Sequence, residues 1–285
     1  MIEFEKNITF VIVCFRSDNV IDKCLESINH NNKVIVVENS NNIFVKDRLE
    51  KKFSNVQVLI SGDNIGYARG NNLGISKVNT KYAFILNPDA YLEKYTLNEL
   101  YKVKNILNDN FSILSPKIFN SKILGVIEDE TKDFIKVNFV KGFAMLLNLE
   151  KINFKEVFDK DFFLFLEEID LCKRVKDNGG KIYIAPKSII YHNGKESSGN
   201  EFRIELCRNW HWMWSLYYYN YKHFGLFKAY KITLYKFVSS LIKMLLSIIL
   251  IQKKNYLIHK YRLLGLINAY QRKKSWLRPD QIKKV

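Results

Sequence analysis

Apolar and polar positions in the first ninety residues alternate between two patterns. Runs of consecutive apolar residues predict buried strands, and apolar residues spaced three or four apart predict helices with one buried face. The strand-like runs cover 8–15, 34–37, 56–60 and 82–86, and the helix-like segments cover 20–28, 45–53 and 68–78. This order predicts an α/β fold with a mostly parallel sheet and helices on both faces.

The carboxyl ends of the predicted strands lie at positions 14–17, 38–41, 61–66 and 87–89. In an open parallel sheet, ligands bind beyond the carboxyl ends of the strands. We therefore expect a binding site at this edge of the sheet.

The regular alternation ends near residue 97. Beyond it the patterns predict a helix at 97–107, strands at 113–119 and 139–149, a helix at 167–176, and short strands at 181–185 and 189–191. Asn178-Gly179-Gly180 is a typical end signal for the second of these helices.

From about residue 202 the chain becomes aromatic and basic. Residues 237–251 form a mostly apolar segment. This segment is shorter than the roughly 20 residues needed to span a bilayer. Lys236, Ser240, Lys243 and Ser247 share one stripe of this predicted helix, which favours an amphipathic helix lying in a membrane interface between basic flanks. A helix packed on the preceding domain is the alternative, and a transmembrane helix is a further one.

Charge divides the chain in the same place. The 285 residues carry a net charge of +16, and residues 202–285 hold 17 Lys and Arg against two acids, so the first 201 residues are nearly neutral. We expect one domain at 1–201, with halves at 1–96 and 97–201, and a basic helical membrane-association region at 202–285. The four cysteines form no CxxC pair, which favours buried thiols in a reducing compartment. The acidic N-terminus does not resemble a signal peptide, so we expect a cytoplasmic protein.

Two acidic motifs, Asn87-Pro88-Asp89 and Glu167-Glu168-Ile169-Asp170, each follow an apolar run. A carboxylate at the end of a buried segment is costly unless a metal, a proton or a partner neutralises it. The two groups would together supply a divalent-cation site and a general base. Each motif also has a purely structural explanation: the first suits a type I turn, and the second suits the positive end of a helix.

Five motifs in order give the chain a family resemblance. They are Ile8–Phe15, Val36-Val-Glu-Asn-Ser40, Asn64-Ile-Gly-Tyr-Ala-Arg-Gly-Asn-Asn-Leu-Gly74, Leu86-Asn-Pro-Asp89, and Glu167-Glu-Ile-Asp-Leu-Cys-Lys-Arg174, followed by Tyr191-His192 and Ser197-Ser198-Gly199. Over residues 8–199 the sequence resembles the family 2 inverting glycosyltransferases with the GT-A fold, in the rhamnosyltransferase-like branch of bacterial surface-polysaccharide synthesis. The block at 64–74 is the most specific of the motifs.

The resemblance implies roles for individual residues. Asp89 is expected to bind Mg²⁺ or Mn²⁺, with His192 as a further ligand. Glu168 stands where the family has an aspartate base; Asp170, which we expect to pair with Arg174, is the alternative base, and Glu167 is a candidate for binding the acceptor hydroxyl. Gly70 is expected to let the backbone approach the nucleotide. The expected nucleotide-sugar-binding residues are Cys14, Phe15, Glu38, Asn64, Gly66, Arg69, Asn72, Asn87 and Gly142.

The implied activity is transfer of a sugar such as rhamnose from a nucleotide-diphosphate donor to a lipid-linked glycan. The basic tail would then hold the enzyme on the anionic inner face of the plasma membrane. Two alternatives stay open. One is a nucleic-acid-binding protein that uses the basic aromatic tail, although the sequence contains no recognition motif for nucleic acid. The other is a glycosyltransferase-like scaffold without activity.

Overall fold

The computed structural model describes residues 1–119, 131–192 and 201–283. It divides into two compact units, which we call the sheet unit and the helical unit. The sheet unit comprises Met1–Asp159 and Glu168–Gly199, and the helical unit comprises Lys160–Glu167 and Asn200–Val285. Ser197-Ser198-Gly199 of the closing motif lies outside the described residues.

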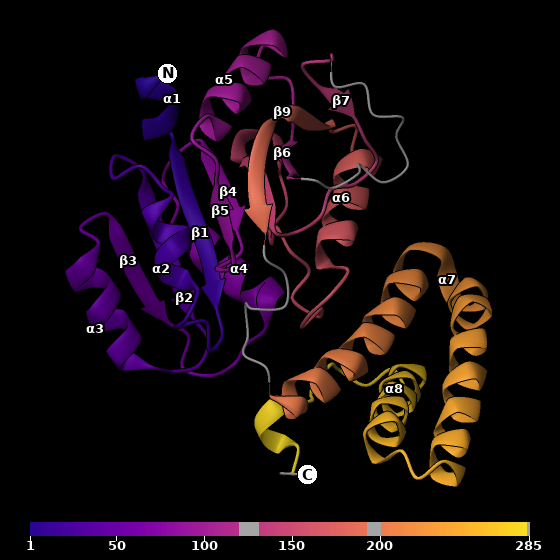
Figure 1. Ribbon diagram of the computed structural model, residues 1–285. Coiled ribbons are helices and arrows are strands. Elements are labelled where there is room, and N and C mark those ends of the chain that lie inside the picture. The colour runs from indigo at the N-terminus through magenta and orange to yellow at the C-terminus, as the bar shows by residue number, and fades with distance from the viewer. Residues whose placement is uncertain (120–130, 193–200, 284–285) are drawn as a thin grey trace. The chain divides into compact units, whose positions relative to one another are not determined.

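Strands and helices of the sheet unit follow the predicted alternation closely over the first half (Figure 1). The strands are β1 (Ile8–Cys14), β2 (Lys33–Glu38), β3 (Val56–Ile60), β4 (Tyr82–Leu86), β5 (Ala90–Leu92), β6 (Ile113–Ile118), β7 (Ile135–Lys136), β8 (Ala144–Asn148) and β9 (Ile182–His192). The helices are α1 (Ile2–Lys6), α2 (Ile21–Glu26), α3 (Ile43–Lys52), α4 (Tyr67–Ile75), α5 (Thr96–Ile106) and α6 (Glu167–Asp177), with a 3₁₀ turn η1 (Leu149–Lys151).

All nine described strands form one sheet, in the order β3-β2-β1-β4-β8-β6-β9-β5, with β7 paired to β9. The first four strands are parallel, and β8 adds to β4 in the antiparallel sense. A doubly wound parallel half therefore continues into a mixed half, as predicted for the fold class.

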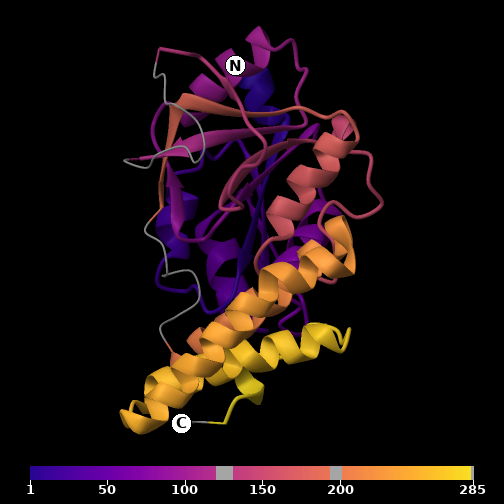
Figure 2. The ribbon, with the colours of Figure 1, turned by 90° about the vertical axis from the view of Figure 1, so that its right-hand side faces the viewer.

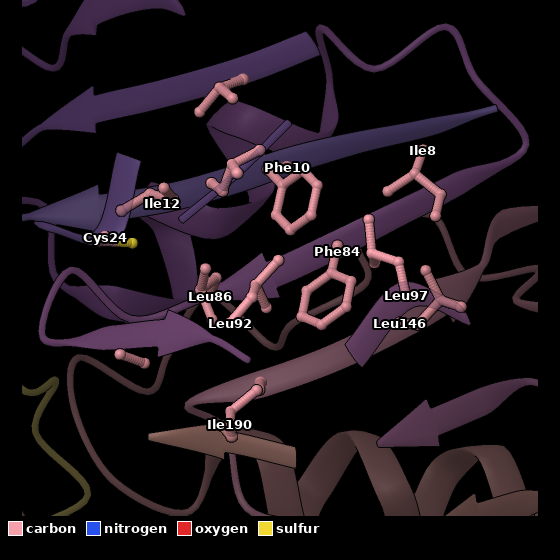
Figure 3. Close-up of a cluster of buried hydrophobic side chains, with 14 of the residues drawn as sticks. Ile8, Phe10, Ile12, Cys24, Phe84, Leu86, Leu92, Leu97, Leu146 and Ile190 are labelled. Atoms are coloured by element: carbon pink, nitrogen blue, oxygen red, sulfur yellow. The ribbon is translucent and has the colours of Figure 1, made fainter. Parts of the chain in front are cut away.

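The core of the sheet unit follows from the alternation of side chains along each strand. Phe10 and Ile12 of β1 point into the larger apolar cluster, where Phe10 stacks on Phe84 of β4 with ring centroids 4.9 Å apart (Figure 3). Val11 and Val13, on the opposite face of β1, lie against α4. Both faces of the parallel half are covered, which explains why its strands read as continuous apolar runs.

Glycines of the 64–74 motif have a packing role on that second face. A Cβ on Gly74 would lie 2.4 Å from Cγ1 of Val11, and a Cβ on Gly70 would lie 2.8 Å from Cγ1 of Val13. The missing side chain of Gly70 thus lets α4 approach the sheet, a packing role that the expectation of a nucleotide contact did not include.

The second half of the sheet unit differs from the prediction in detail. Strand β8 begins at Ala144, five residues later than expected, because Gly142 and Phe143 form a turn. The two predicted short strands are one strand, β9, because a bulge shifts its register with β6 between Pro116 and Lys117. The three short elements α1, β5 and β7 have too few residues to show a period.

Two long helices, α7 (Phe202–Ile249) and α8 (Lys253–Tyr270), and a 3₁₀ turn η2 (Pro279–Gln281) make up most of the helical unit. Gly225 interrupts α7 with φ 81° and ψ 177°, a conformation that glycine reaches without steric cost. The helix doubles back there, and α8 packs against it (Figures 1 and 2). The predicted helix at 237–251 is thus the last part of α7, while α8 was not predicted.

The helices of this unit approach closely. A Cβ on Gly265 of α8 would lie 2.3 Å from the carbonyl oxygen of Trp210 in α7, so only glycine fits this crossing. The surrounding core contains Trp210, Trp214, Tyr217, Leu266 and Ala269.

The polar stripe predicted on residues 236–247 is only partly as expected, because Lys236 and Lys243 are exposed but the two serines are not. Ser240 and Ser247 are buried, whereas large apolar side chains on the same stretch of α7 are exposed to solvent. We call the exposed set, together with residues 250–251, the apolar face: Phe227, Leu234, Tyr235, Val238, Leu241, Ile242, Leu245, Leu246, Ile248, Ile249, Leu250 and Ile251. Among the described helices, α7 is the one that is long and apolar enough to cross a membrane, and its most apolar window is only 17% buried.

The segment Lys160–Glu167, expected in the first domain, packs with the helical unit instead. Ser215 Oγ of α7 donates a hydrogen bond to the Leu164 carbonyl at 2.8 Å, and the Phe163 ring stacks on His211 with centroids 4.3 Å apart. The eight residues before Glu168 are therefore anchored by α7.

Candidate active site

Asp89 lies in the turn between β4 and β5. The turn is closed by the Ala90 amide, which donates to the Asn87 carbonyl at 3.1 Å, as expected for an Asn-Pro turn. Ala90 pairs with His192 in the β5–β9 register, and His192 Nε2 lies 3.3 Å from Asp89 Oδ1. The sheet thus brings together the two expected cation ligands, which are far apart in the sequence.

Asp89 is almost completely buried. Burial, and next the Asp89 charge, raise the pKa of the neighbouring Cys24 thiol well above its usual range. Cys24 therefore stays protonated near Asp89 at neutral pH, and its Sγ lies 3.5 Å from the Asn87 carbonyl, to which it donates. A protonated thiol adds no second negative charge beside the carboxylate.

Tyr67, the first residue of α4, joins two segments at this edge. Its hydroxyl lies 3.0 Å from Asn87 Oδ1 and 2.8 Å from the Gly142 carbonyl. A hydroxyl has one proton, so it donates to one of these oxygens at a time. Tyr67 was not among the expected site residues, although its aromatic ring is part of the 64–74 motif.

Glu168 lies next to the turn that Gly142 and Phe143 form. A Cβ on Gly142 would lie 3.2 Å from the Glu168 Cβ, so glycine leaves room for the glutamate side chain. The following residue, Phe143, stacks its ring on His192 with centroids 4.7 Å apart. A series of neighbours therefore connects Asp89 through His192, Phe143 and Gly142 to Glu168 within the sheet unit.

The three acids of the second motif have different environments. Asp170 is fully buried, and Arg174 Nε donates to its Oδ2 at 2.7 Å, which confirms the expected pair. Because Arg174 also donates to the Val157 carbonyl at 2.5 Å, the pair fixes α6 to a neighbouring loop. A buried, ion-paired Asp170 has no access to an acceptor hydroxyl, so we set aside this alternative base. Glu167 is also buried, whereas Glu168 is partly exposed.

The backbone immediately before α6 is strained. Phe165 and Leu166 have φ values of 72° and 66°, in the left-handed region that non-glycine residues rarely occupy. Each such residue costs about 1–2 kcal/mol. The candidate base is therefore preceded by a turn that its surroundings must hold in place.

Glu38 holds its own loop. It is buried at the end of β2, where its Oε1 accepts from the Ser40 amide at 2.9 Å and its Oε2 accepts from the Asn42 amide at 2.7 Å. Ser40 Oγ in turn accepts from the Arg16 amide at 2.7 Å. The expected contact of Glu38 with a nucleotide would use the remaining lone pairs of an already engaged carboxylate.

Cys14 and Phe15 end the neighbouring strand β1. Burial raises the pKa of Cys14 well above its usual range, and its carbonyl accepts from the Asn39 amide at 2.8 Å. The Arg16 guanidinium lies over the Phe15 ring, 5.1 Å from the centroid. Arg16 is a cation at the carboxyl edge of the sheet, and it was not among the residues that the motifs indicated.

Two asparagines of the 64–74 motif also bind the chain itself. Asn64 Oδ1 accepts from the Gly66 amide at 3.2 Å, at a residue whose φ of 84° suits glycine. Asn72 exchanges two hydrogen bonds, of 2.7 and 2.9 Å, with the backbone of Phe158. The expected donor role of Asn72 is thus taken by a loop contact, while the Arg69 side chain on the same helix is exposed.

Residues 9–165 match the model of glycosyl transferase family 2. The chain belongs to this family. It is 25% identical over 193 residues to a low-salt glycan biosynthesis hexosyltransferase, Agl10, of Haloferax volcanii, covering 60% of this chain and 62% of that protein. It is 21% identical over 237 residues to the rhamnosyltransferase WbbL of Escherichia coli, covering 69% of this chain and 88% of that protein.

Solved structures of glycosyltransferases share the fold of this family 2 protein. Staphylococcus aureus TarS, residues 1–349, matches with a TM-score of 0.52 and 12% identity over 93% of this chain and 92% of that chain. The mannosyltransferase PcManGT of Pyrobaculum calidifontis, in complex with GDP-Man and Mn²⁺, matches with a TM-score of 0.56 and 12% identity over 94% of this chain and 88% of that chain. These likenesses confirm the predicted GT-A fold.

The candidate ligand side chains of this family 2 protein fit a divalent cation for which the protein supplies only part of the coordination. Among the described residues, no group of three or more His, Cys, Asp or Glu side chains gathers in one place. Asp89 and His192 offer two ligands, and Mg²⁺ is commonly held by one or two carboxylates together with substrate phosphates and water. The residues are therefore compatible with a cation whose coordination a donor diphosphate completes.

Proposed function

We propose that the protein is an inverting glycosyltransferase that moves a hexose from a nucleotide-diphosphate donor to a lipid-linked glycan during glycan synthesis. The series of neighbours from Asp89 to Glu168 supports this proposal, because it connects the candidate cation ligands to a partly exposed carboxylate through three residues. The names of the two relatives support a hexosyl donor, and rhamnose is the first sugar to test.

Glu168 is the proposed general base. It takes the proton of the acceptor hydroxyl while that oxygen attacks the anomeric carbon from the side opposite the leaving diphosphate, so that the configuration inverts in one step. Gly142 leaves space beside Glu168. The Tyr67 hydroxyl connects Gly142 to Asn87 through its contacts with both residues.

Asp89 and His192 are the proposed ligands of Mg²⁺ or Mn²⁺. Bound there, the cation would neutralise charge that develops on the leaving nucleotide diphosphate. The exposed Arg69 and the nearby strand-end residues Arg16 and Phe15 are proposed to line the nucleotide side, together with Asn64 and Gly66. Glu38 and Asn72 are proposed to act through the loops that they hold.

The test of activity is a panel of nucleotide sugars, incubated with Mn²⁺ or Mg²⁺ and monitored for release of nucleotide diphosphate. Glu168→Gln should reduce transfer by about 10²-fold or more, because general base catalysis contributes about 10²–10⁴-fold, and should leave donor binding intact. Glu150→Gln makes the same change at an exposed glutamate and should leave transfer unchanged. Transfer by Glu168→Gln at the rate of the unsubstituted protein would refute the base assignment, and absence of release with every donor would favour the scaffold alternative.

The apolar face of α7 is proposed to lie in the cytoplasmic leaflet of the plasma membrane. Its exposed side chains include Phe227 at 82% and Ile249 at 74%, and exposed lysines such as Lys228 and Lys253 flank it. Apolar side chains between basic flanks suit an interface with anionic lipids.

Vesicle sedimentation tests this placement. Phe227→Ser with Ile249→Ser should release the protein from vesicles that contain phosphatidylserine, whereas Phe44→Ser, at an equally exposed phenylalanine of the sheet unit, should not. Extraction at high pH distinguishes a peripheral protein from one that spans the membrane. Salt-sensitive binding to oligonucleotides, with no binding to vesicles, would favour the nucleic-acid alternative.

A further inference from the structure

The helical unit contains a pocket of its own, with a volume of about 280 Å³. It lies between the first arm of α7, the end of α8 and the segment that follows α8. Asp161, Trp214, Tyr217, Tyr218, Tyr221, Ala269, Arg272, Lys273 and Lys274 line it. No residue of this set belongs to the candidate active site.

Aromatic rings form one wall of the pocket. Trp214 stacks on Tyr218 with centroids 4.8 Å apart, and the rings of Tyr217 and Tyr221 are parallel within 2°. Trp214 Nε1 donates to the Lys273 carbonyl at 2.9 Å, which ties the basic segment to the aromatic wall. The wall is therefore preformed, as ligand pockets usually are.

Cationic side chains form the rim. Arg272, Lys273 and Lys274 are all exposed, and the Arg272 guanidinium lies 5.3 Å from the centroid of the Tyr221 ring. Asp161 is the one carboxylate in the lining, and its Oδ2 accepts from the Tyr218 hydroxyl at 3.3 Å. Three cations against one acid give the pocket a net positive charge, which favours an anion.

Arg272 occupies a backbone position that suits glycine. The end of α8 is closed by the Arg272 amide, which donates to the Ala269 carbonyl at 2.8 Å, and by the Lys273 amide, which donates to the Asn268 carbonyl at 3.1 Å. Its φ of 56° lies in the left-handed region, which glycine most often supplies at helix ends. A strained arginine whose side chain borders a pocket is a typical mark of a functional site.

We propose that this pocket binds a phosphate ester that carries a sugar ring, namely the diphosphate headgroup of the lipid-linked acceptor. The identity of that ligand rests on the proposed function. Arginine and lysine donate charge-assisted hydrogen bonds to phosphate oxygens, and aromatic faces cover the apolar face of a sugar. The pocket is small enough to select a headgroup, while the apolar face on the same unit suits the lipid chain.

The experiment measures binding of the full chain to phosphatidylcholine vesicles that carry a small fraction of either a polyprenyl diphosphate with one attached sugar or phosphatidylserine. Arg272→Gly with Lys274→Gln should weaken binding to the diphosphate lipid by about tenfold or more, because it removes two of the three cations available to phosphate oxygens. Lys260→Gln removes one exposed cation of α8 outside the pocket and should change this binding little. Glycine suits the backbone at 272, so thermal unfolding should not shift downward.

Three results would overturn the proposal. The first is unchanged binding of the double variant to the diphosphate lipid. The second is an equal loss on phosphatidylserine vesicles, which would indicate a general anionic surface. The third is equally tight binding of free pyrophosphate, which would indicate a site for a soluble anion. Nucleotide release by the unsubstituted protein, measured in parallel, tests the proposed function separately, so selective binding of the diphosphate lipid would stand even if no donor were turned over.

Discussion

Acid should destabilise the helical unit through one buried histidine. His211 is fully buried in α7, where its Nε2 donates to the Leu277 carbonyl at 2.8 Å and its ring stacks on Phe163. Burial, followed by the nearby Arg278 guanidinium, lowers the pKa of His211 from 6.5 to about 3, against the opposing effect of the Leu277 hydrogen bond. The folded protein therefore keeps His211 neutral over the whole mildly acidic range.

The sign of the effect follows from proton binding. Below pH 6.5 the unfolded chain binds a proton at His211 that the folded chain does not bind until about pH 3. The free energy of unfolding therefore decreases as the pH is lowered through this window. Each pKa unit corresponds to about 1.4 kcal/mol, which gives a loss of about 2 kcal/mol between pH 7 and pH 5.

Intrinsic fluorescence can follow this unit alone, because all four tryptophans of the chain, Trp210, Trp212, Trp214 and Trp276, lie in it. Urea unfolding of the unsubstituted protein and of His211→Gln should be compared at several pH values. Glutamine keeps a donor for the Leu277 carbonyl and does not titrate. The variant should lack about 2 kcal/mol of the pH dependence between pH 7 and pH 5. His259→Gln is a comparison: burial lowers the pKa of that partly exposed histidine in the same direction, so its removal should also reduce the pH dependence, and His211→Gln should reduce it more. Equal pH dependence in His211→Gln and the unsubstituted protein would refute the reasoning.

Three alanine substitutions test the close approaches described above. Gly74→Ala should destabilise the sheet unit by about 1–3 kcal/mol, because its Cβ would lie 2.4 Å from Val11 Cγ1, and far-ultraviolet circular dichroism in urea should detect the loss. Gly179→Ala, where φ is 77° and nothing lies within 4 Å of a new Cβ, should cost only the backbone strain of about 1 kcal/mol and separates strain from crowding. Gly265→Ala should destabilise the helical unit at least as much as Gly74→Ala destabilises the sheet unit, because the Trp210 carbonyl at 2.3 Å is backbone and cannot rotate away. Tryptophan fluorescence in urea should detect this loss of stability. A stability equal to that of the unsubstituted protein would contradict the packing.

The parallel half of the sheet could be predicted from the sequence because its pattern has one cause. Strands covered on both faces must be apolar at every position, and the helices that cover them must be apolar on one side. The predicted run at 8–15 therefore matches β1 within one residue, and 56–60 and 82–86 match β3 and β4.

Short strands of the mixed half were beyond such reasoning. Ile135–Lys136 is extended because it pairs with β9, and Ala90–Leu92 is extended for the same reason. Pairing depends on residues distant in the sequence, so two or three residues carry no period of their own.

The direction of a helix face is a further limit, as α7 demonstrates. The spacing indicated a stripe that contains Ser240 and Ser247, but not that these two serines are buried while Lys236 and Lys243 are exposed. Small residues on one face let helices approach closely, as Gly265 does at Trp210, and they then face the protein even when they are polar. The same spacing is thus compatible with opposite orientations.

Within the candidate site, the motifs identified residues better than they identified contacts. Asp89 and His192 were both expected to bind the cation, and the β5–β9 register is the contact that makes them neighbours. Glu38 and Asn72 were chosen as ligand contacts, yet their side chains hold backbone atoms of nearby loops. A single sequence does not distinguish a motif residue that stabilises a loop from one that contacts a ligand.

The turn at Phe165 and Leu166 connects the stability of the helical unit to the candidate base. Two successive left-handed residues together cost about 2–4 kcal/mol and persist only where the surroundings hold them. Phe165 makes an edge-to-face contact with Trp212, with centroids 5.5 Å apart, and the preceding Leu164 carbonyl is held by α7. Because the chain passes directly from this turn to Glu168, we expect the position of the candidate base to be lost when acid unfolds the helical unit. Transfer activity should then decline in acid together with the tryptophan signal, and more gradually in His211→Gln.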